Sequence, residues 1–200
     1  MTLFSKKDLN LIESQVIKEN VVKKEIKKLI EKEFLDIQKD FLLSFDKHPV
    51  TMEIEAGVNS TNISGTLNGI GNLFTYIGFS SGSKPIRPLR QILQKYEIQY
   101  HTQKTSVKIN IILPTKEEVF AVAPMPWAKG RSWAKGIEKG ISGLGNYLVK
   151  HQEIEASKSG KAIQTGYQVR SGKFRNTTYI SKLLNDYYKE IKKLEKKVFT

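Results

Sequence analysis

Residues 124–148 read PMPWAKGRSWAKGIEKGISGLGNYL and combine tryptophan, lysine and glycine at short intervals. The unit WAKG occurs twice, at 127–130 and at 133–136. Glycine weakens a helix, lysine resists burial, and tryptophan has a large apolar surface that is costly to leave in water. A segment that combines these residue types therefore has a structural or a binding reason.

From Ser132 onward this segment predicts a helix, because serine is a preferred N-cap residue. One apolar stripe on this helix contains Trp133, Ile137, Ile141, Leu144 and Leu148. A neighbouring stripe contains Gly136, Gly140 and Gly143. Each glycine inside a helix costs about 1 kcal/mol relative to alanine, so close approach of another backbone must offset that cost. We favour internal packing as the reason for the glycine stripe, and we keep a contact with another subunit and a contact with a ligand as alternatives.

Trp127 precedes the predicted helix and follows Pro124 and Pro126, which stiffen the approach to it. We favour packing of this ring onto the first turn of the helix, as a hydrophobic staple, over stacking on a nucleic-acid base. A single-strand binder usually spreads several aromatic residues over a basic sheet face.

Residues 5–45 predict a long amphipathic helix, or two helices with a break near Asn20. Their apolar residues recur mostly three or four positions apart, with Lys and Glu between them. Ser5 with Asp8 predicts the N-terminal cap. Pro49 should end the helix, because the residue before a proline disfavours helical backbone. We interpret the lysine run at 23–28 as a solvated helix face.

The centre of the chain predicts strands around one short helix. VTMEIEAG (50–57) and NLFTYIGF (72–79) predict strands, the second of them apolar on both faces. Pro88 suits the first turn of a short helix that runs to about Tyr96. EIQYHT (97–102) and SVKINIIL (106–113) alternate polar and apolar residues and predict a hairpin.

The last third of the chain predicts further strands and a closing helix. EEVFAVAP (117–124) could add one strand, and KAIQTGYQVR (161–170) alternates in the same way. A closing amphipathic helix follows residue 176, with an apolar stripe of Ile180, Leu183, Leu184, Tyr187, Ile191, Leu194 and Val198.

The order of these elements predicts the α+β class, with a small, mostly antiparallel sheet and a glycine-rich helix between two amphipathic helices. We predict a single domain over residues 1–200. Its long N-terminal helix occupies 1–46 and its C-terminal helix occupies 176–200.

The net charge of +13 is concentrated in the last part of the chain. Residues 121–200 carry 16 Lys and Arg against 6 Asp and Glu, whereas residues 1–50 carry 10 against 9. Such a concentration of positive charge is typical of a protein with a phosphate-bearing or acidic partner.

The loops SKSGK (157–161) and RSGKFR (170–175) are small and basic, and they could follow a phosphate backbone without distinguishing bases. Solvated surface loops explain them equally well. The candidates for DNA-facing residues are Lys158, Lys161, Arg170, Lys173 and Arg175.

No charged residue lies between Glu55 and Lys84. The many Asn, Ser, Thr and Gly residues in this run would be costly in hydrocarbon, so we expect no membrane span. Depletion of charge is typical of the centre of a protein interface. We therefore expect Thr66–Gly78 to lie against neighbouring subunits, so that Leu67→Lys or Thr75→Lys blocks assembly and leaves the subunit folded. The candidates for a subunit interface are Leu67, Phe74, Thr75, Tyr76, Trp127, Trp133, Gly136, Gly140 and Gly143.

Few residue patterns in the chain predict catalysis. The absence of cysteine excludes disulfides, thiol catalysis and cysteine-based metal sites. Asp46, His48, Glu53 and Glu55 form the most suggestive cluster, because two glutamates on one strand face could hold a divalent ion. Exposed polar residues at a helix–strand junction explain the cluster equally well. We predict no enzymatic activity, no cofactor and no metal.

Several phrases of the sequence resemble a small virion-associated protein of T4-like marine bacteriophages. They are HPVTMEIEAG, NISGTL, GNLFTYIGF, the opening stretch PMPWAKGRSWAKGIEKGISGLGNYL, and SGKAIQTGYQVRSGKFRNTTYISKLL, within residues 47–185. A long N-terminal helix followed by an S-G-T-L strand start also resembles the tail-completion, or head-to-tail connector, family of the phage neck.

The resemblance implies a structural protein of the virion, assembled in the host cytoplasm. It would form a homo-oligomeric ring, commonly sixfold, that contacts portal, neck or tail proteins and lets DNA pass through its lumen. A sequence-independent nucleic-acid-binding protein is the competing hypothesis, and a metal-dependent nuclease is the third.

Overall fold

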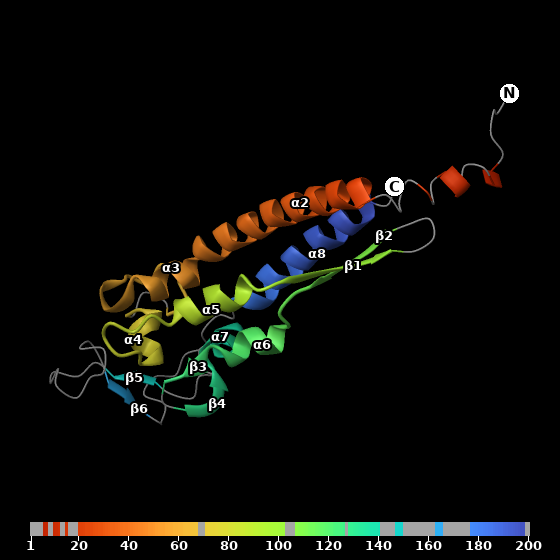
Figure 1. Cartoon of the computed structure of the whole chain (residues 1–200). Coiled ribbons are helices and arrows are strands. Elements are labelled where there is room, and N and C mark those ends of the chain that lie inside the picture. Colours follow the sequence, from red (N-terminus) through yellow and green to blue (C-terminus); the bar gives the residue numbers. More distant parts are fainter. Residues whose placement is uncertain are drawn as a thin grey trace. The chain divides into compact units, whose positions relative to one another are not determined.

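The structure is a computed structural model (Figure 1) that describes residues 6–7, 10–12, 15, 20–67, 71–102, 107–126, 128–140, 147–149, 163–165 and 177–198. Helices and two-stranded antiparallel sheets alternate along the chain, which confirms the α+β class and the two long helices near the chain ends.

The chain divides into two compact units. Unit 1 contains Met1–Asp40, Tyr96–Leu113 and Tyr187–Thr200, and unit 2 contains Phe41–Lys95 and Pro114–Asp186. The helices α2 (Asn20–Asp46) and α8 (Ile180–Val198) each contribute residues to both units. The expectation of one domain over the whole chain stays a prediction.

Helix α2 begins at Asn20 and ends at Asp46. The next helix, α3 (Pro49–Glu55), has Pro49 in its first turn, so the sequence His48-Pro49 ends one helix and begins another. The predicted end of the N-terminal helix is confirmed. The predicted cap at Ser5 lies outside the described residues.

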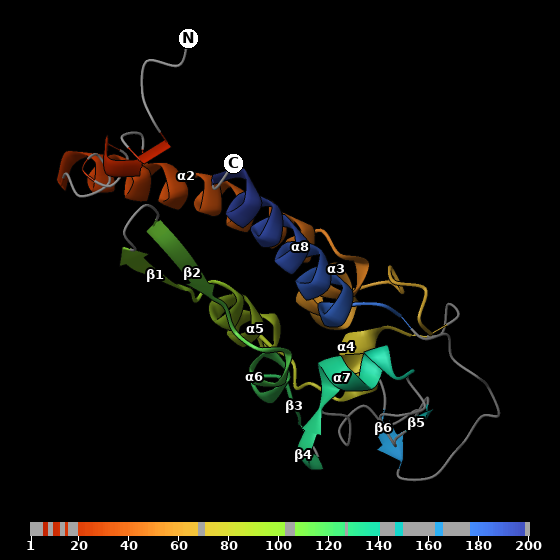
Figure 2. The same ribbon diagram turned by 90° about the vertical axis from the view of Figure 1, so that its right-hand side faces the viewer.

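Unit 1 contains the predicted hairpin, formed by β1 (Glu97–Thr102) and β2 (Val107–Ile112). The two strands run side by side in Figure 2 and pair antiparallel, with Tyr100 opposite Ile109. One face of the hairpin is therefore apolar and the other polar, as the alternation in the sequence predicts. The hairpin prediction is confirmed.

The core of unit 1 comes from these strands and from the two long helices. The portions of α2 and α8 that belong to this unit run side by side in Figures 1 and 2. The Phe34 ring lies 4.6 Å from the Tyr96 ring, between centroids. The buried side chains of this unit include Ile30, Phe34, Ile109, Tyr187, Ile191 and Leu194.

Two segments of unit 2 that we predicted as strands are helices. Residues 50–57 fall in α3 and in the 3₁₀ helix η1 (Gly57–Asn59), and residues 72–79 contain α4 (Leu73–Ile77). For residues 72–79, capping at both ends explains why the segment is a helix instead of the predicted strand. The Asn72 side chain accepts a hydrogen bond from Thr75 N–H at the start of α4, and Gly78 ends it in the left-handed conformation, with φ 86°. These local contacts outweigh the β propensity of the segment.

The predicted strand at 117–124 is also wrong, because Lys116–Ala121 form helix α6. A capping box starts it: the Thr115 hydroxyl accepts from Glu118 N–H, and the Glu118 carboxylate accepts from Thr115 N–H. These hydrogen bonds lower the pKa of Glu118. Helix α5 (Ile86–Leu93) contains Pro88 in its first turn and confirms the predicted short helix.

Among the described residues of the opening stretch, only Trp133–Glu138 are helical. It contains β3 (Pro124–Met125), β4 (Ala128–Ser132), α7 (Trp133–Glu138) and β5 (Tyr147–Val149). Ser132 is the predicted N-cap, with its hydroxyl 3.4 Å from the N–H of Lys135. The predicted continuation to Leu148 is wrong, because α7 ends at Glu138 and Gly140 has φ 92°, a left-handed conformation.

Strand β5 pairs antiparallel with β6 (Ile163–Thr165), which is the described part of the predicted strand at 161–170. Within the part of the chain that the structure describes, none of the helices combines the length and the apolar character that a bilayer crossing requires.

Candidate functional site

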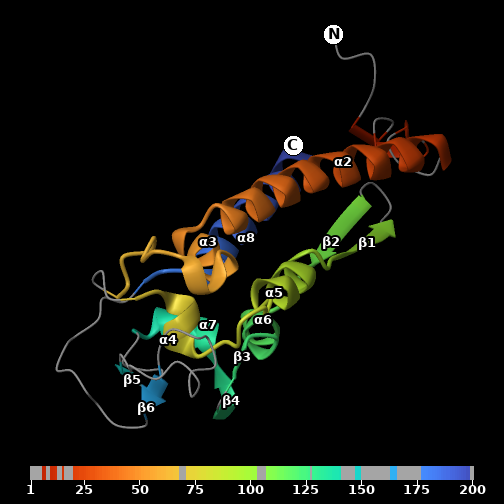
Figure 3. The same ribbon diagram turned by 90° about the vertical axis from the view of Figure 1, so that its left-hand side faces the viewer.

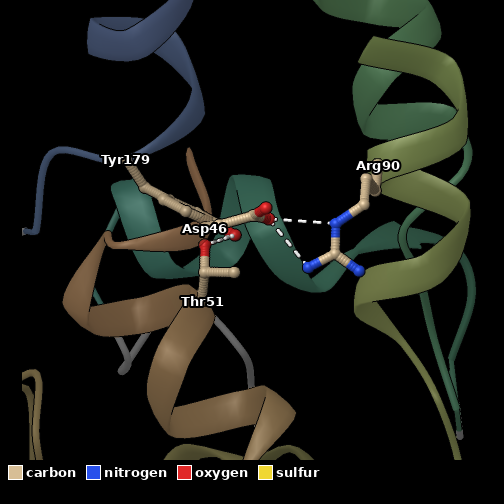
Figure 4. Close-up of polar contacts among 4 residues, drawn as sticks. All are labelled: Asp46, Thr51, Arg90 and Tyr179. Carbon is tan, nitrogen blue, oxygen red and sulfur yellow. Dashed lines mark hydrogen bonds and ion pairs between the residues drawn. The ribbon is translucent and has the colours of Figure 1, made fainter. Parts of the chain in front are cut away.

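A cluster of polar and aromatic residues in unit 2 surrounds Tyr179, immediately before α8. This fully buried ring lies 4.8 Å from the His48 ring, 6.2 Å from Phe45 and 6.4 Å from Trp133, between centroids. Its hydroxyl lies 2.8 Å from the Thr51 hydroxyl (Figure 4), and burial strongly raises the pKa of the phenol. Tyr179 is therefore a neutral residue that joins the start of α8 to α3.

Trp133 from the second WAKG unit belongs to the same cluster. Its ring is almost fully buried and packs edge-on against Phe79, with 5.8 Å between centroids. Phe79 lies two residues after the end of α4, and Figures 2 and 3 both show α4 and α7 as neighbours. Internal packing, the explanation that we favoured for the opening stretch, accounts for the place of Trp133, which was also a candidate for the subunit interface.

Asp46 and Arg90 form an ion pair that joins the end of α2 to α5 (Figure 4). Arg90 donates from Nε at 2.9 Å and from Nη2 at 2.7 Å, both to the Oδ1 atom of Asp46. Because both side chains remain partly exposed, such a pair contributes at most about 1 kcal/mol to stability. Asp46 therefore has a structural partner.

His48 connects the start of α3 to the residues that precede α8. Its Nδ1 atom accepts from the N–H of Val50 at 3.3 Å, and its Nε2 atom lies 3.1 Å from the carbonyl oxygen of Thr178. Only the neutral tautomer with a proton on Nε2 satisfies both contacts. Burial lowers the pKa of His48, the bond to Thr178 opposes that shift, and nearby Lys182 lowers the pKa further.

Glu53 is fully buried and holds the segment between α3 and α4. Its two carboxylate oxygens accept from the N–H of Ser64 and from the N–H of Leu73, each at 2.7 Å. Glu55 is exposed instead. The two glutamates lie on a helix, where residues two apart point in different directions, so the expected shared strand face does not exist.

The suggested divalent-ion cluster is therefore not assembled. Asp46 pairs with Arg90, His48 bonds backbone atoms, and Glu53 accepts backbone N–H groups. Across the described ranges, no group of three or more His, Asp or Glu residues could hold a metal ion.

Glu138, the last residue of α7, caps α8 from a distance in the sequence. Its carboxylate accepts hydrogen bonds from both the N–H and the hydroxyl of Ser181. A carboxylate at a helix N-terminus also interacts favourably with the helix dipole. We did not predict this contact, the Asp46–Arg90 pair or the role of Tyr179. A sequence pattern does not reveal pairs 43 and 44 positions apart.

The predicted interface residues that the structure describes lie inside the chain itself. These buried residues are Leu67, Phe74, Thr75, Tyr76, Trp133, Gly136 and Gly140. A subunit contact through their side chains would require them to leave the core, so the missing charge at 66–67 and 72–78 has an internal explanation. Trp127 and Gly143 lie outside the described residues.

All five predicted DNA-facing residues also lie outside the described residues, namely Lys158, Lys161, Arg170, Lys173 and Arg175. Only Ile163–Thr165 is described in that region, as β6. Contact with DNA at these positions stays a prediction.

Comparison of the chain with protein-family models, with curated proteins and with solved structures found no match in any of the three.

Proposed function

We propose that this chain is a structural protein of a tailed-phage virion and has no enzymatic activity. The observation that supports this best is the use of its polar side chains. Asp46, His48 and Glu53, the strongest candidates for chemistry, are each engaged in a contact that joins two helices or closes a loop. Each of these side chains therefore has a structural role in the fold.

The phrases within residues 47–185 that resemble a virion protein of T4-like phages support a place in the neck. There the chain acts as a head-to-tail connector or as a tail-completion ring component. The proposed assembly is a homo-oligomeric ring of sixfold symmetry that contacts portal, neck or tail proteins. DNA passes through its lumen, and the chain needs no cofactor.

Native mass spectrometry of the purified full chain tests this proposal. We expect a closed oligomer of defined size, and an image of the intact phage particle should place the chain between head and tail. A chain that stays monomeric at every concentration and does not bind any phage neck protein contradicts the proposal.

The charge balance favours a second candidate, a sequence-independent nucleic-acid-binding protein. Residues 121–200 hold 16 of the 33 Lys and Arg residues but only 6 of the 20 Asp and Glu residues. Tight DNA binding by a monomer would favour this candidate over the ring. Cleavage of plasmid DNA that requires a divalent ion would favour the third candidate, a nuclease, and would contradict the absence of enzymatic activity.

A further inference from the structure

Residues 128–140, which form β4 and α7, carry a concentration of positive charge on exposed side chains. The four exposed cations are Lys129, Arg131, Lys135 and Lys139. Glu138 is the only acidic residue between Glu118 and Glu153. The β4–α7 segment is therefore strongly basic, and no role has yet been assigned to its charge.

The fold does not neutralise this charge within the part of the chain that the structure describes. The carboxylate of Glu138 is engaged elsewhere, because it accepts hydrogen bonds from the N–H and the hydroxyl of Ser181. Among the described residues, none of the four cationic side chains has an ion-pair or hydrogen-bond partner. Arg90, by contrast, is held by Asp46.

The backbone that carries the four cations is fixed by the core of unit 2. Figure 2 shows β4 running directly into α7, and Trp133 at this junction is 1% exposed. Its N–H donates to the carbonyl oxygen of Ala123 at 2.9 Å, and β4 pairs with β3. A surface on an ordered backbone loses little conformational entropy when it binds a partner.

The spacing of the cations on α7 is also fixed. The N–H of Lys139 donates to the carbonyl oxygen of Lys135 at 3.2 Å, which is the helical hydrogen bond between residues four apart. The two side chains therefore lie on one face of the helix, about 6 Å apart along its axis.

Gly130, between the two cations of β4, leaves open space beside them. Its φ is 72°, and an added Cβ would meet nothing within 4 Å. The glycine is therefore required by conformation and not by internal packing, and the exposed backbone at this position allows a partner to approach closely.

The chemistry of the surface favours a nucleic acid over an acidic protein as the partner. The apolar side chains of residues 129–140 are Trp133, Ala134 and Ile137, and all three are buried. The surface therefore lacks the exposed apolar centre that is typical of a protein interface. Lysine and arginine side chains alone are sufficient for contacts with a phosphate backbone, which need no apolar centre.

We propose that β4 and α7 form a binding surface for the phosphate backbone of a nucleic acid, through Lys129, Arg131, Lys135 and Lys139. This surface explains the repeated Lys-Gly pairs, since each lysine is exposed while Gly136 and Gly140 are buried. It lies outside the 157–175 region that the sequence predicted to face DNA. It also goes beyond the proposed function, because it needs neither a ring nor a place in the virion.

The test measures binding of short fluorescent DNA duplexes of two unrelated sequences to the full chain, by anisotropy, over a salt series. One variant replaces all four cations of the surface by alanine. The matched control also replaces three lysines and one arginine by alanine, at exposed and separate positions of unit 2. These control positions are Lys47, Lys84, Arg87 and Lys95.

We expect the surface variant to lose at least roughly tenfold in affinity for both duplexes and the control variant to lose clearly less. The slope of log affinity against log salt should fall by about 1 for each phosphate contact removed. Circular dichroism of both variants should match that of the wild type, because all the changed side chains are exposed. If the fourfold surface variant misfolds, the double variants at 129 with 131 and at 135 with 139 should each show part of the loss.

Three results would overturn the proposal. They are equal losses in the surface and control variants, a wild type that does not bind either duplex at about 50 mM salt, and binding of polyglutamate or phosphatidylserine vesicles as tight as that of DNA. Native mass spectrometry separates this inference from the proposed function. A monomer that binds DNA through β4 and α7 supports the surface and contradicts the ring, whereas an oligomer with equal losses contradicts only the surface.

Discussion

His48 shows how one residue makes stability depend on pH. Its ordinary pKa is 6.5, and burial lowers the value in the folded chain, so the unfolded chain binds the proton more readily. The contribution of neutral His48 to stability should therefore be fully present above pH 6.5. It should be lost as the pH decreases through the lowered pKa of His48 in the folded chain. Protonation of Nδ1 also removes the acceptor for Val50 N–H. Urea unfolding at several pH values measures this loss.

Two histidine variants separate this effect from general acid sensitivity. His48→Asn keeps a side-chain acceptor at the N-cap but does not titrate, so the fall in stability with decreasing pH should be smaller than in the wild type. His101→Asn changes an exposed residue of the hairpin and should retain the wild-type dependence. Identical pH dependence in all three proteins would contradict the assignment to His48.

At the scale of a single element, the end of α7 depends on Gly140. Gly140→Val places a β-branched residue at φ 92° in a buried position, which costs at least about 1–2 kcal/mol. Lys139→Ala removes an exposed side chain next to it and should stay within about 0.5 kcal/mol of the wild type. Thermal unfolding should show a clearly lower midpoint only for Gly140→Val. Equal midpoints would refute the role of this glycine.

Helix α4 leads to a second prediction about an element. Thr75 is 3% exposed and Leu67, nearby in the sequence, is 1% exposed, so Thr75→Lys and Leu67→Lys each bury an ammonium group without a partner. Both variants should therefore unfold or lose solubility, whereas the sequence predicted folded subunits that fail to assemble. Circular dichroism distinguishes these results, with Thr61→Lys as the exposed control.

At the scale of the whole molecule, the uneven charge predicts how the chain binds DNA. Any binding should be independent of sequence and should weaken by orders of magnitude between about 50 and 200 mM salt, because neutralised phosphates release counterions. Replacing Lys161, Arg170, Lys173 and Arg175 together by alanine should weaken it further. Replacing Lys23, Lys24, Lys28 and Lys32 of α2 by alanine removes the same charge and should have less effect. Fluorescence anisotropy with two unrelated DNA duplexes measures the affinity of both alanine variants. An equal loss of affinity in the two variants would show that only total charge matters.

The sequence by itself determined the elements whose signals are long or local. The helices α2 and α8 repeat their apolar residues over 27 and 19 residues, and the hairpin alternates over two strands of six residues each. His48-Pro49, Pro88 and Ser132 mark helix ends through the geometry of their own side chains. These patterns act between neighbours in the chain, so a sequence displays them.

The tertiary structure alone decided the use of the polar residues, and in the short segments it acted together with local capping. Residues 72–79 have high β propensity, yet the N–H of Leu73 is held by Glu53, 20 positions away, and the segment becomes a helix. Glu138 caps α8 from 43 positions away, and Tyr179 binds Thr51 from 128 positions away. A short helix has few local contacts beyond its caps, so partners that the fold brings close are needed to stabilise it.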